Sequence, residues 1–242
     1  MNSGRRMSWT GYPHMSDLAI IVEGQTEHAF VRDVLAPHLR GFGVGAWARL
    51  PGRVHRRGGV PAWEVVRGDV LRTLRERRGR YCTTMFDFYA MPPDWPGRRD
   101  ASGQVVSERG EFVETALLRD IAERAGDDFN AALFIPYVQV HEFEAMVFSN
   151  VEVLSATLSP LCRTSRDKLA AIFASIVAEA GEPEAIDDRP EYAPSKRIGS
   201  EVPAYRKALY GPMIANRIGI QAIREVCHHF NAWLQRLESL GG

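Results

Sequence analysis

The 242-residue sequence is poor in cysteine and has no long apolar run. Its three cysteines, Cys82, Cys162 and Cys227, are widely spaced and form no C-x-x-C pair, which excludes a disulfide scaffold and indicates a reducing compartment. The longest apolar runs, 18–22 and 131–138, are far shorter than the roughly 18 to 20 residues that span a bilayer. We therefore expect a cytoplasmic protein that does not cross a membrane.

The sequence also lacks a GxxxxGKS or GxxxxGKT phosphate loop, which excludes a Walker-type ATPase within this chain. With 45% hydrophobic and 25% charged residues, the composition is that of an ordinary globular protein and excludes a disordered or collagen-like chain. At this length the fold needs no metal or disulfide for its stability, so a bound metal would serve chemistry.

The net charge of zero conceals an uneven distribution of charge. Residues 1–80 carry 14 Lys and Arg against 7 Asp and Glu, whereas residues 81–162 carry 5 against 13. The basic third, which includes Arg56 and Arg57, could contact a polyanion such as nucleic acid, or could form a solvated helix face. The acidic third indicates a cation site more strongly, because like charges gathered in one place favour binding of a cation.

Strand and helix patterns alternate along the first 150 residues. Short apolar runs typical of buried parallel strands are followed each time by helical periodicity, which predicts an α/β domain with a mostly parallel sheet and right-handed crossovers. Strands are expected at 17–22, 44–50, 82–88 and 131–138, with helices at 26–39, 61–74 and 111–125.

The predicted organisation has three parts. Residues 1–16 are interpreted as a flexible leader, 17–150 as the α/β core, and 151–242 as a helical C-terminal part packed on that core. Within the last part, helices are expected at 165–180 and 203–239, separated by a polar stretch at 181–200.

Carboxylates follow three of the predicted strands. Glu23 comes after the first strand and Asp87 lies near the end of the third, while Glu142 and Glu144 follow the fourth. The carboxyl ends of parallel strands meet at one edge of a sheet, where open α/β folds bind ligands. Oxygen ligands from separate rigid elements suit a hard cation such as Mg²⁺ or Mn²⁺. We therefore predict a metal site at this edge; the pattern does not decide between Glu142 and Glu144.

Other residues near these positions have two interpretations each. Glu27 is a candidate catalytic group or an acid that complements the helix dipole, and His141 is a candidate general acid or base or a structural hydrogen-bonding group. Tyr89 would support Asp87 if the strand persists. An expected loop brings together a hydroxyl and two cations, from Ser195, Lys196 and Arg197. This group is suited to bind a phosphate, or it is a chance cluster of polar residues on the surface.

Four segments in order resemble a bacterial family called domain of unknown function 4276. The resemblance covers roughly residues 17 to 240. Its motifs are Ile20 to Glu27, Phe86 to Tyr89 with the Pro-rich loop after it, His141 to Ala145, and the tail segments 193–197 and 227–233. That family is regarded as similar to the Toprim fold of topoisomerases, primases and OLD-type nucleases, and its members are often encoded beside ATPases in phage-defence loci.

The resemblance implies roles for two residues. Glu23 matches the Toprim Glu, and Asp87 matches the first Asp of the Toprim Asp-x-Asp motif. Tyr89 stands where the second Asp is expected, so either Glu142 or Glu144 replaces that carboxylate or catalysis is lost.

Three functions are compatible with these residues. The first is a metal-dependent nuclease, or another phosphoryl-transfer enzyme, that acts on DNA or RNA with a separately encoded ATPase in bacterial defence. The second is a degenerate Toprim module that binds nucleic acid or a partner protein, and the third is a hydrolase of nucleotides or small phosphoesters. A homo-oligomer is compatible with each of them.

Overall fold

The computed structural model describes residues 15–52, 59–126, 129–186 and 192–242. One five-stranded sheet has the order β2-β1-β3-β4, and β5 pairs with the last residues of β3, further along that strand than β4. All of these pairings are parallel, which confirms the predicted fold class. The strands are β1 (Ser16–Val22), β2 (Val44–Arg49), β3 (Tyr81–Asp87), β4 (Phe134–Ile135) and β5 (Val138–Gln139).

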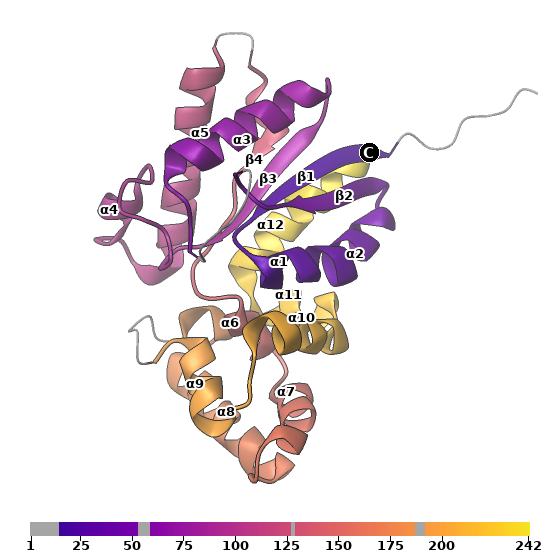
Figure 1. Cartoon of the computed structure of the whole chain (residues 1–242), viewed down its shortest axis with the longest axis vertical. Coiled ribbons are helices and arrows are strands. Elements are labelled where there is room, and N and C mark those ends of the chain that lie inside the picture. The colour runs from indigo at the N-terminus through magenta and orange to yellow at the C-terminus, as the bar shows by residue number, and fades with distance from the viewer. Residues whose placement is uncertain (1–14, 53–58, 127–128, 187–191) are drawn as a thin grey trace, which may run out of the picture.

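Helices cover both faces of the sheet (Figure 1). One face is covered by α3 (Trp63–Glu76) and α5 (Arg109–Ala125), and the short α4 (Arg98–Ala101) packs with them. The other face is covered first by α1 (Gln25–Phe30) and α2 (Ala36–Arg40), which are joined by a π-helical turn at Val31–Leu35.

The chain beyond the sheet is helical. Its elements are α6 (Glu144–Val147), α7 (Val151–Leu158), α8 (Arg166–Ala180), α9 (Pro194–Glu201), α10 (Lys207–Ile218), α11 (Ile220–Val226) and α12 (His228–Glu238). In Figure 1, α7, α8 and α9 lie away from the sheet, whereas α12 lies against it. The Trp233 indole N–H donates to the Thr83 hydroxyl over 2.9 Å, and the Ser16 hydroxyl donates to the Leu240 carbonyl over 2.6 Å. The end of the chain is thereby tied to β1 and β3.

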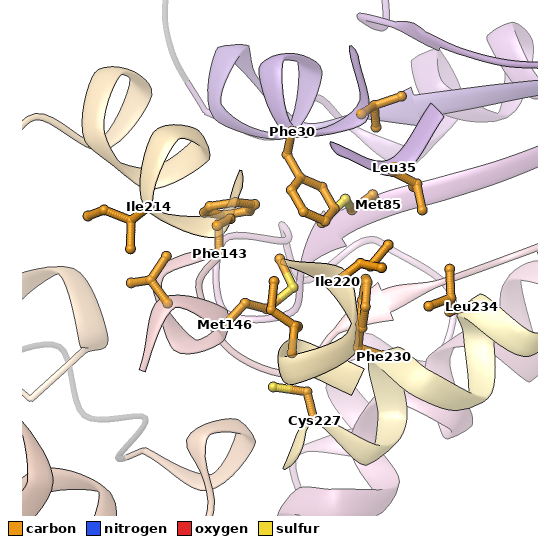
Figure 2. Packing of buried hydrophobic residues seen from close by; sticks show 14 of the residues in the cluster. Phe30, Leu35, Met85, Phe143, Met146, Ile214, Ile220, Cys227, Phe230 and Leu234 are labelled. Carbon is orange, nitrogen blue, oxygen red and sulfur yellow. The ribbon is translucent and has the colours of Figure 1, made fainter. Parts of the chain in front are cut away.

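Buried side chains form two clusters, one on each face of the sheet. Leu18, Ile20 and Val22 of β1 point into the larger cluster, which includes the helices after residue 143, whereas Ile21 points into the smaller one. Figure 2 shows Phe30 and Phe143 meeting in the larger cluster, with ring centroids 5.3 Å apart. The continuous apolar run of β1 is therefore explained by burial on both faces.

Several boundaries differ from the prediction. The stretch 203–239 is not one helix but α10, α11 and α12, because the chain turns at Gly219, where φ is +81°, and again at Cys227. The stretch 181–200 contains most of helix α9, and β1 already begins at Ser16, inside the expected leader. Residues 1–14, and Arg56 and Arg57, lie outside the described residues.

The predicted strand 131–138 is interrupted. Residues Ala131–Leu133 form a 3₁₀ turn, and β4 and β5 are separated at Pro136, which has no N–H to donate to the ladder. The buried Thr84 hydroxyl bridges this gap, since it accepts from the Tyr137 N–H and donates to the Tyr137 carbonyl, each over 3.0 Å. One side chain thus replaces two missing ladder bonds.

Replacing Thr84 with Val should lower the free energy of unfolding by about 2 kcal/mol, because two buried backbone groups of Tyr137 lose their partner. Thr84→Ser keeps the hydroxyl and should lose less than about 1 kcal/mol, the value of a buried methyl group. Urea unfolding of both variants checks this prediction, and equal losses would contradict it.

Candidate active site

The carboxyl ends of β1 and β3 define the candidate site. The two strands are neighbours, but β1 leads into α1 on one face and β3 leads through α4 into α5 on the other. This is a topological switch point, where open α/β sheets bind their ligands. Glu23 directly follows β1, and Asp87 is the last residue of β3.

Glu23 and Asp87 are in contact at this edge, as predicted for strand-end carboxylates. The Asp87 backbone N–H donates to Glu23 Oε2 over 3.1 Å, and the Tyr89 N–H donates to Asp87 Oδ1 over 3.0 Å. Phe88, which lies between Asp87 and Tyr89, continues the backbone pairing of β3 with β5, since its N–H donates to the Gln139 carbonyl over 2.8 Å. The backbone therefore fixes both carboxylates.

Glu27 lies one turn into α1 and caps the helix start. Its Oε2 accepts a hydrogen bond from the Gly24 N–H over 2.9 Å. The side chain therefore caps the N-terminus of α1 and also adds a carboxylate to the acidic edge of the sheet. Burial, followed by the charge of Glu23, raises the pKa of Glu27 to about 7. A carboxyl group with this pKa can exchange a proton near neutral pH.

Glu142 and Glu144 are held by a single cation, Lys207, the first residue of α10. Its Nζ lies 2.8 Å from Glu142 Oε1 and 3.2 Å from Glu144 Oε2. The Tyr205 hydroxyl also donates to Glu144 Oε1 over 3.1 Å, and the Ser195 N–H donates to Glu142 Oε2 over 2.9 Å. Both glutamates therefore approach the site, and both are already compensated there.

The carboxylates differ in their pKa shifts. Burial, then repulsion from Glu23 and Glu142, raises the pKa of Asp87 well above its ordinary value, and burial also raises the pKa of Glu23. Burial raises the pKa of Glu144 despite Lys207. For Glu142 the same burial is outweighed by Lys207 and by the hydrogen bond from Ser195, so its pKa is lowered. The charged forms of Glu23 and Asp87 are therefore disfavoured when no cation is present.

β3 ends at Asp87, so the strand does not persist to Tyr89, which lies in the turn after it, and His141 packs against Tyr89. His141 is 2% exposed, and its ring lies 5.5 Å from the Tyr89 ring, centroid to centroid. The Tyr89 hydroxyl accepts a hydrogen bond from Arg109 of α5. Tyr89 therefore links the end of β3 to α5, at the position that the second Asp occupies in the Toprim Asp-x-Asp motif.

The expected phosphate loop at Ser195, Lys196 and Arg197 is a helix, which corrects the prediction. Pro194 occupies the first turn of α9, where its missing N–H costs nothing. Ser195 contacts Glu142 through its N–H, whereas the Arg197 guanidinium lies 4.8 Å from the Tyr192 ring and 3.8 Å from Glu179. Lys196 is exposed. Of the three, only Ser195 contacts a site carboxylate through a hydrogen bond that the structure shows.

Several of the basic residues of the first third lie at the opposite end of the sheet. Arg77 and Arg80 pair with Asp17 at the start of β1, and Arg80 also pairs with Glu76. The seven residues of β1 separate this end of the strand from Glu23 by roughly 20 Å, at about 3.3 Å per residue. These arginines therefore do not border the candidate site.

Sequence reasoning missed Lys207 and Tyr205. A lysine in the first turn of a helix is unfavourable, because the helix dipole is positive there. This position was the sequence signal that Lys207 pairs with a nearby acidic residue. Its pKa is raised, because Glu144 and Glu142 outweigh the opposing effect of burial.

The carboxylates at this edge are the oxygen ligands that a divalent cation would need. Within the described part of the chain, no group of three or more His, Cys, Asp or Glu side chains is arranged as a metal centre. Mg²⁺, however, commonly takes one or two carboxylates and completes its shell with water and substrate phosphate. Glu23 and Asp87 are in contact, and the charge of Glu23 repels that of Asp87, so the pair matches that smaller requirement.

The chain belongs to the family described as "Domain of unknown function (DUF4276)", whose model matches residues 22–238. No curated protein matches it. Among solved structures, it is similar to the C-terminal region of the Xanthomonas campestris pv. campestris OLD protein, with 15% identity and a TM-score of 0.43 over 93% of this chain and 95% of that one. In the residues that the structure describes, no helix combines the length and apolar character needed to cross a membrane.

The raised pKa of Glu27 predicts a pH dependence of stability. The acid has a pKa of about 7 in the folded chain against 4.5 for the ordinary group, so the folded state binds the proton more tightly. This stabilisation is complete below about pH 4.5 and is lost as the pH rises through 7. Removing it by Glu27→Gln should reduce the fall in unfolding free energy between pH 5 and pH 8 by about 2 kcal/mol.

Urea unfolding at the two pH values, in buffer free of divalent cations, measures this difference. Glu152→Gln is the matched control, because Glu152 is an exposed carboxylate paired with Arg166 at the surface. The prediction is wrong if Glu27→Gln and Glu152→Gln lose the same stability between the two pH values.

Proposed function

We propose that this protein is a divalent-metal-dependent phosphoryl-transfer enzyme, specifically a nuclease that acts on DNA or RNA. The observation that carries the proposal is the contact between Glu23 and Asp87 at the switch point of the sheet. Burial raises both pKa values there, and the charge of Glu23 raises that of Asp87 further. Two partly buried carboxylates in this arrangement are stabilised by a cation.

Glu23 and Asp87 would hold Mg²⁺ or Mn²⁺. Such an ion, when bound, polarises a phosphate oxygen and lowers the pKa of a water molecule. The residues of the chain supply the remainder. The Tyr89 N–H keeps Asp87 oriented, and Glu27, with a pKa of about 7, is suited to accept or return a proton at neutral pH. His141 adjoins Tyr89 and is a second candidate for proton transfer.

The proposed biological setting rests on the sequence rather than on the site. The resemblance to a family encoded beside ATPases in phage-defence loci supports a separate ATPase partner, and the chain has no Walker phosphate loop of its own. The motifs that match Glu23 and Asp87 support a Toprim-like relationship.

Two observations favour a second candidate, a non-catalytic module that binds nucleic acid or a partner protein. Lys207 already pairs with both Glu142 and Glu144, and Tyr89 occupies the place of the second Toprim Asp. In a module of this kind the carboxylates at the sheet edge would be structural, and no cation would be needed.

Thermal unfolding with added Mg²⁺ or Mn²⁺ tests the metal site. A metal at 100 times its Kd should stabilise the folded protein by about 2.7 kcal/mol, whereas Asp87→Asn and Glu23→Gln should shift little with metal. Without metal, Asp87→Asn should melt above the unchanged protein, since a repelled carboxylate is removed. Glu152→Gln serves as the control and should respond to metal normally.

Cleavage assays separate the enzyme from the module. Supercoiled DNA, single-stranded DNA and RNA are incubated with the protein and Mn²⁺, alone and with any ATPase that is encoded beside it. The enzyme should lose at least about 100-fold in rate in Asp87→Asn, the scale of a lost ligand or transition-state contact, while still binding its substrate. Binding that persists with no cleavage under any of these conditions would favour the module.

A further inference from the structure

Arg98 is held rigidly in the connection that follows Asp87. Its guanidinium lies over the Phe88 ring, 3.9 Å from the centroid, and its Nε donates to the Phe88 carbonyl over 2.8 Å. Its Nη1 donates to the Ser102 hydroxyl over 3.1 Å. A side chain held at three points loses little further entropy on binding a ligand, so Arg98 is preorganised.

Arg98 forms no ion pair with a carboxylate among the residues that the structure describes. Its hydrogen bonds go to a carbonyl and a hydroxyl, both neutral. Partial burial lowers the pKa of Arg98, and Arg109 acts in the same direction, whereas Tyr89 and Asp87 act to raise it. Buried charges in proteins are normally paired, so a half-buried guanidinium with neutral partners is suited to bind an anion from outside the chain.

The surroundings of Arg98 add to the positive charge. Arg109 lies 5.9 Å from the centroid of the same Phe88 ring and donates to the Tyr89 hydroxyl. The two guanidiniums therefore flank the two residues that follow Asp87. Lys207 approaches the carboxylates from α10, a separate element, and is engaged by Glu142 and Glu144.

The position next to Asp87 indicates what the anion is. Phe88 is the residue after Asp87, and its N–H is fixed by the Gln139 carbonyl, so Arg98 is anchored to the same strand end as the carboxylates. Carboxylates repel a phosphate, whereas a planar guanidinium binds one with two parallel hydrogen bonds. A phosphodiester chain that placed one phosphate at Asp87 would bring a neighbouring phosphate to a different point of the edge.

We propose that Arg98 binds a backbone phosphate next to the one that reacts, and that the substrate is consequently a nucleic-acid strand rather than a mononucleotide. This proposal rests on the proposed function and identifies its substrate class. A phosphomonoester has no second phosphate in the chain and would leave Arg98 without an anion.

Salt dependence of binding tests this directly. Binding of fluorescein-labelled single strands of about 20 nucleotides and the matching duplex is followed by anisotropy between about 50 and 200 mM salt, in the full chain with Ca²⁺ present. Arg98→Gln should weaken binding about tenfold and reduce the slope of log K against log salt by about one, the change expected for one lost phosphate contact. Arg99→Gln is the matched control, because Arg99 is its exposed neighbour with the same charge.

Arg98→Lys separates phosphate binding from a role in loop structure. The lysine keeps the charge and should keep the salt slope, but it should weaken binding several-fold because it cannot form two parallel hydrogen bonds. If Arg98→Gln lowers the melting temperature while its salt slope equals that of Arg99→Gln, Arg98 only anchors the loop and the proposal is overturned. Should Arg98→Gln fail to fold, wild-type affinity in Arg98→Lys overturns it.

The outcomes also separate this proposal from the proposed function. If metal raises the melting temperature and cleavage occurs, but Arg98→Gln and Arg99→Gln have equal slopes of log K against log salt, the proposed phosphate contact of Arg98 is wrong and the proposed nuclease activity stands. A reduced slope for Arg98→Gln without metal shift or cleavage would establish the phosphate site and remove the enzyme. A protein that binds neither oligonucleotide overturns the phosphate site.

Discussion

Repulsion among carboxylates gathered at one edge of the sheet is the constraint on which the site depends. Parallel strands deliver Glu23 and Asp87 to the same edge, where Glu142, just before α6, and Glu144, the first residue of α6, are added. Two such groups about 4 Å apart repel by about 4 kcal/mol at an effective dielectric near 20. Backbone N–H groups reduce this repulsion by donating hydrogen bonds to Glu23, Glu27 and Glu142. The Lys207 ammonium group reduces it further by pairing with Glu142 and Glu144.

That ammonium group reaches the site only because α10 packs closely on α1 and α6. Gly211 allows the approach, since a Cβ there would lie 3.3 Å from the Phe143 ring and 3.4 Å from the Thr26 methyl group. A larger residue would push α10 outward and withdraw Lys207 from Glu144, which is fully buried. Apolar packing within the larger cluster therefore sets the electrostatics of the site.

Sequence patterns over a few residues predicted the features of the fold that depend on interactions between nearby residues. Apolar runs and helical periodicity located β1 and β3, and the parallel arrangement placed Glu23 and Asp87 together. The interruption at Pro136 was missed because its repair depends on the Thr84 hydroxyl, 53 residues from Tyr137 in the chain. Lys207 lies 65 residues from Glu142, and helix α9 was hidden by its polar composition. Contacts between distant segments leave no periodic signal.

The substitution at Tyr89 gains a physical meaning from these contacts. The tyrosine hydroxyl accepts from Arg109, so this position links β3 to α5 and contributes no charge. Neither Glu142 nor Glu144 supplies the missing carboxylate while Lys207 engages both. A cation held by Glu23 and Asp87 would gain no further carboxylate from the chain unless it displaced Lys207.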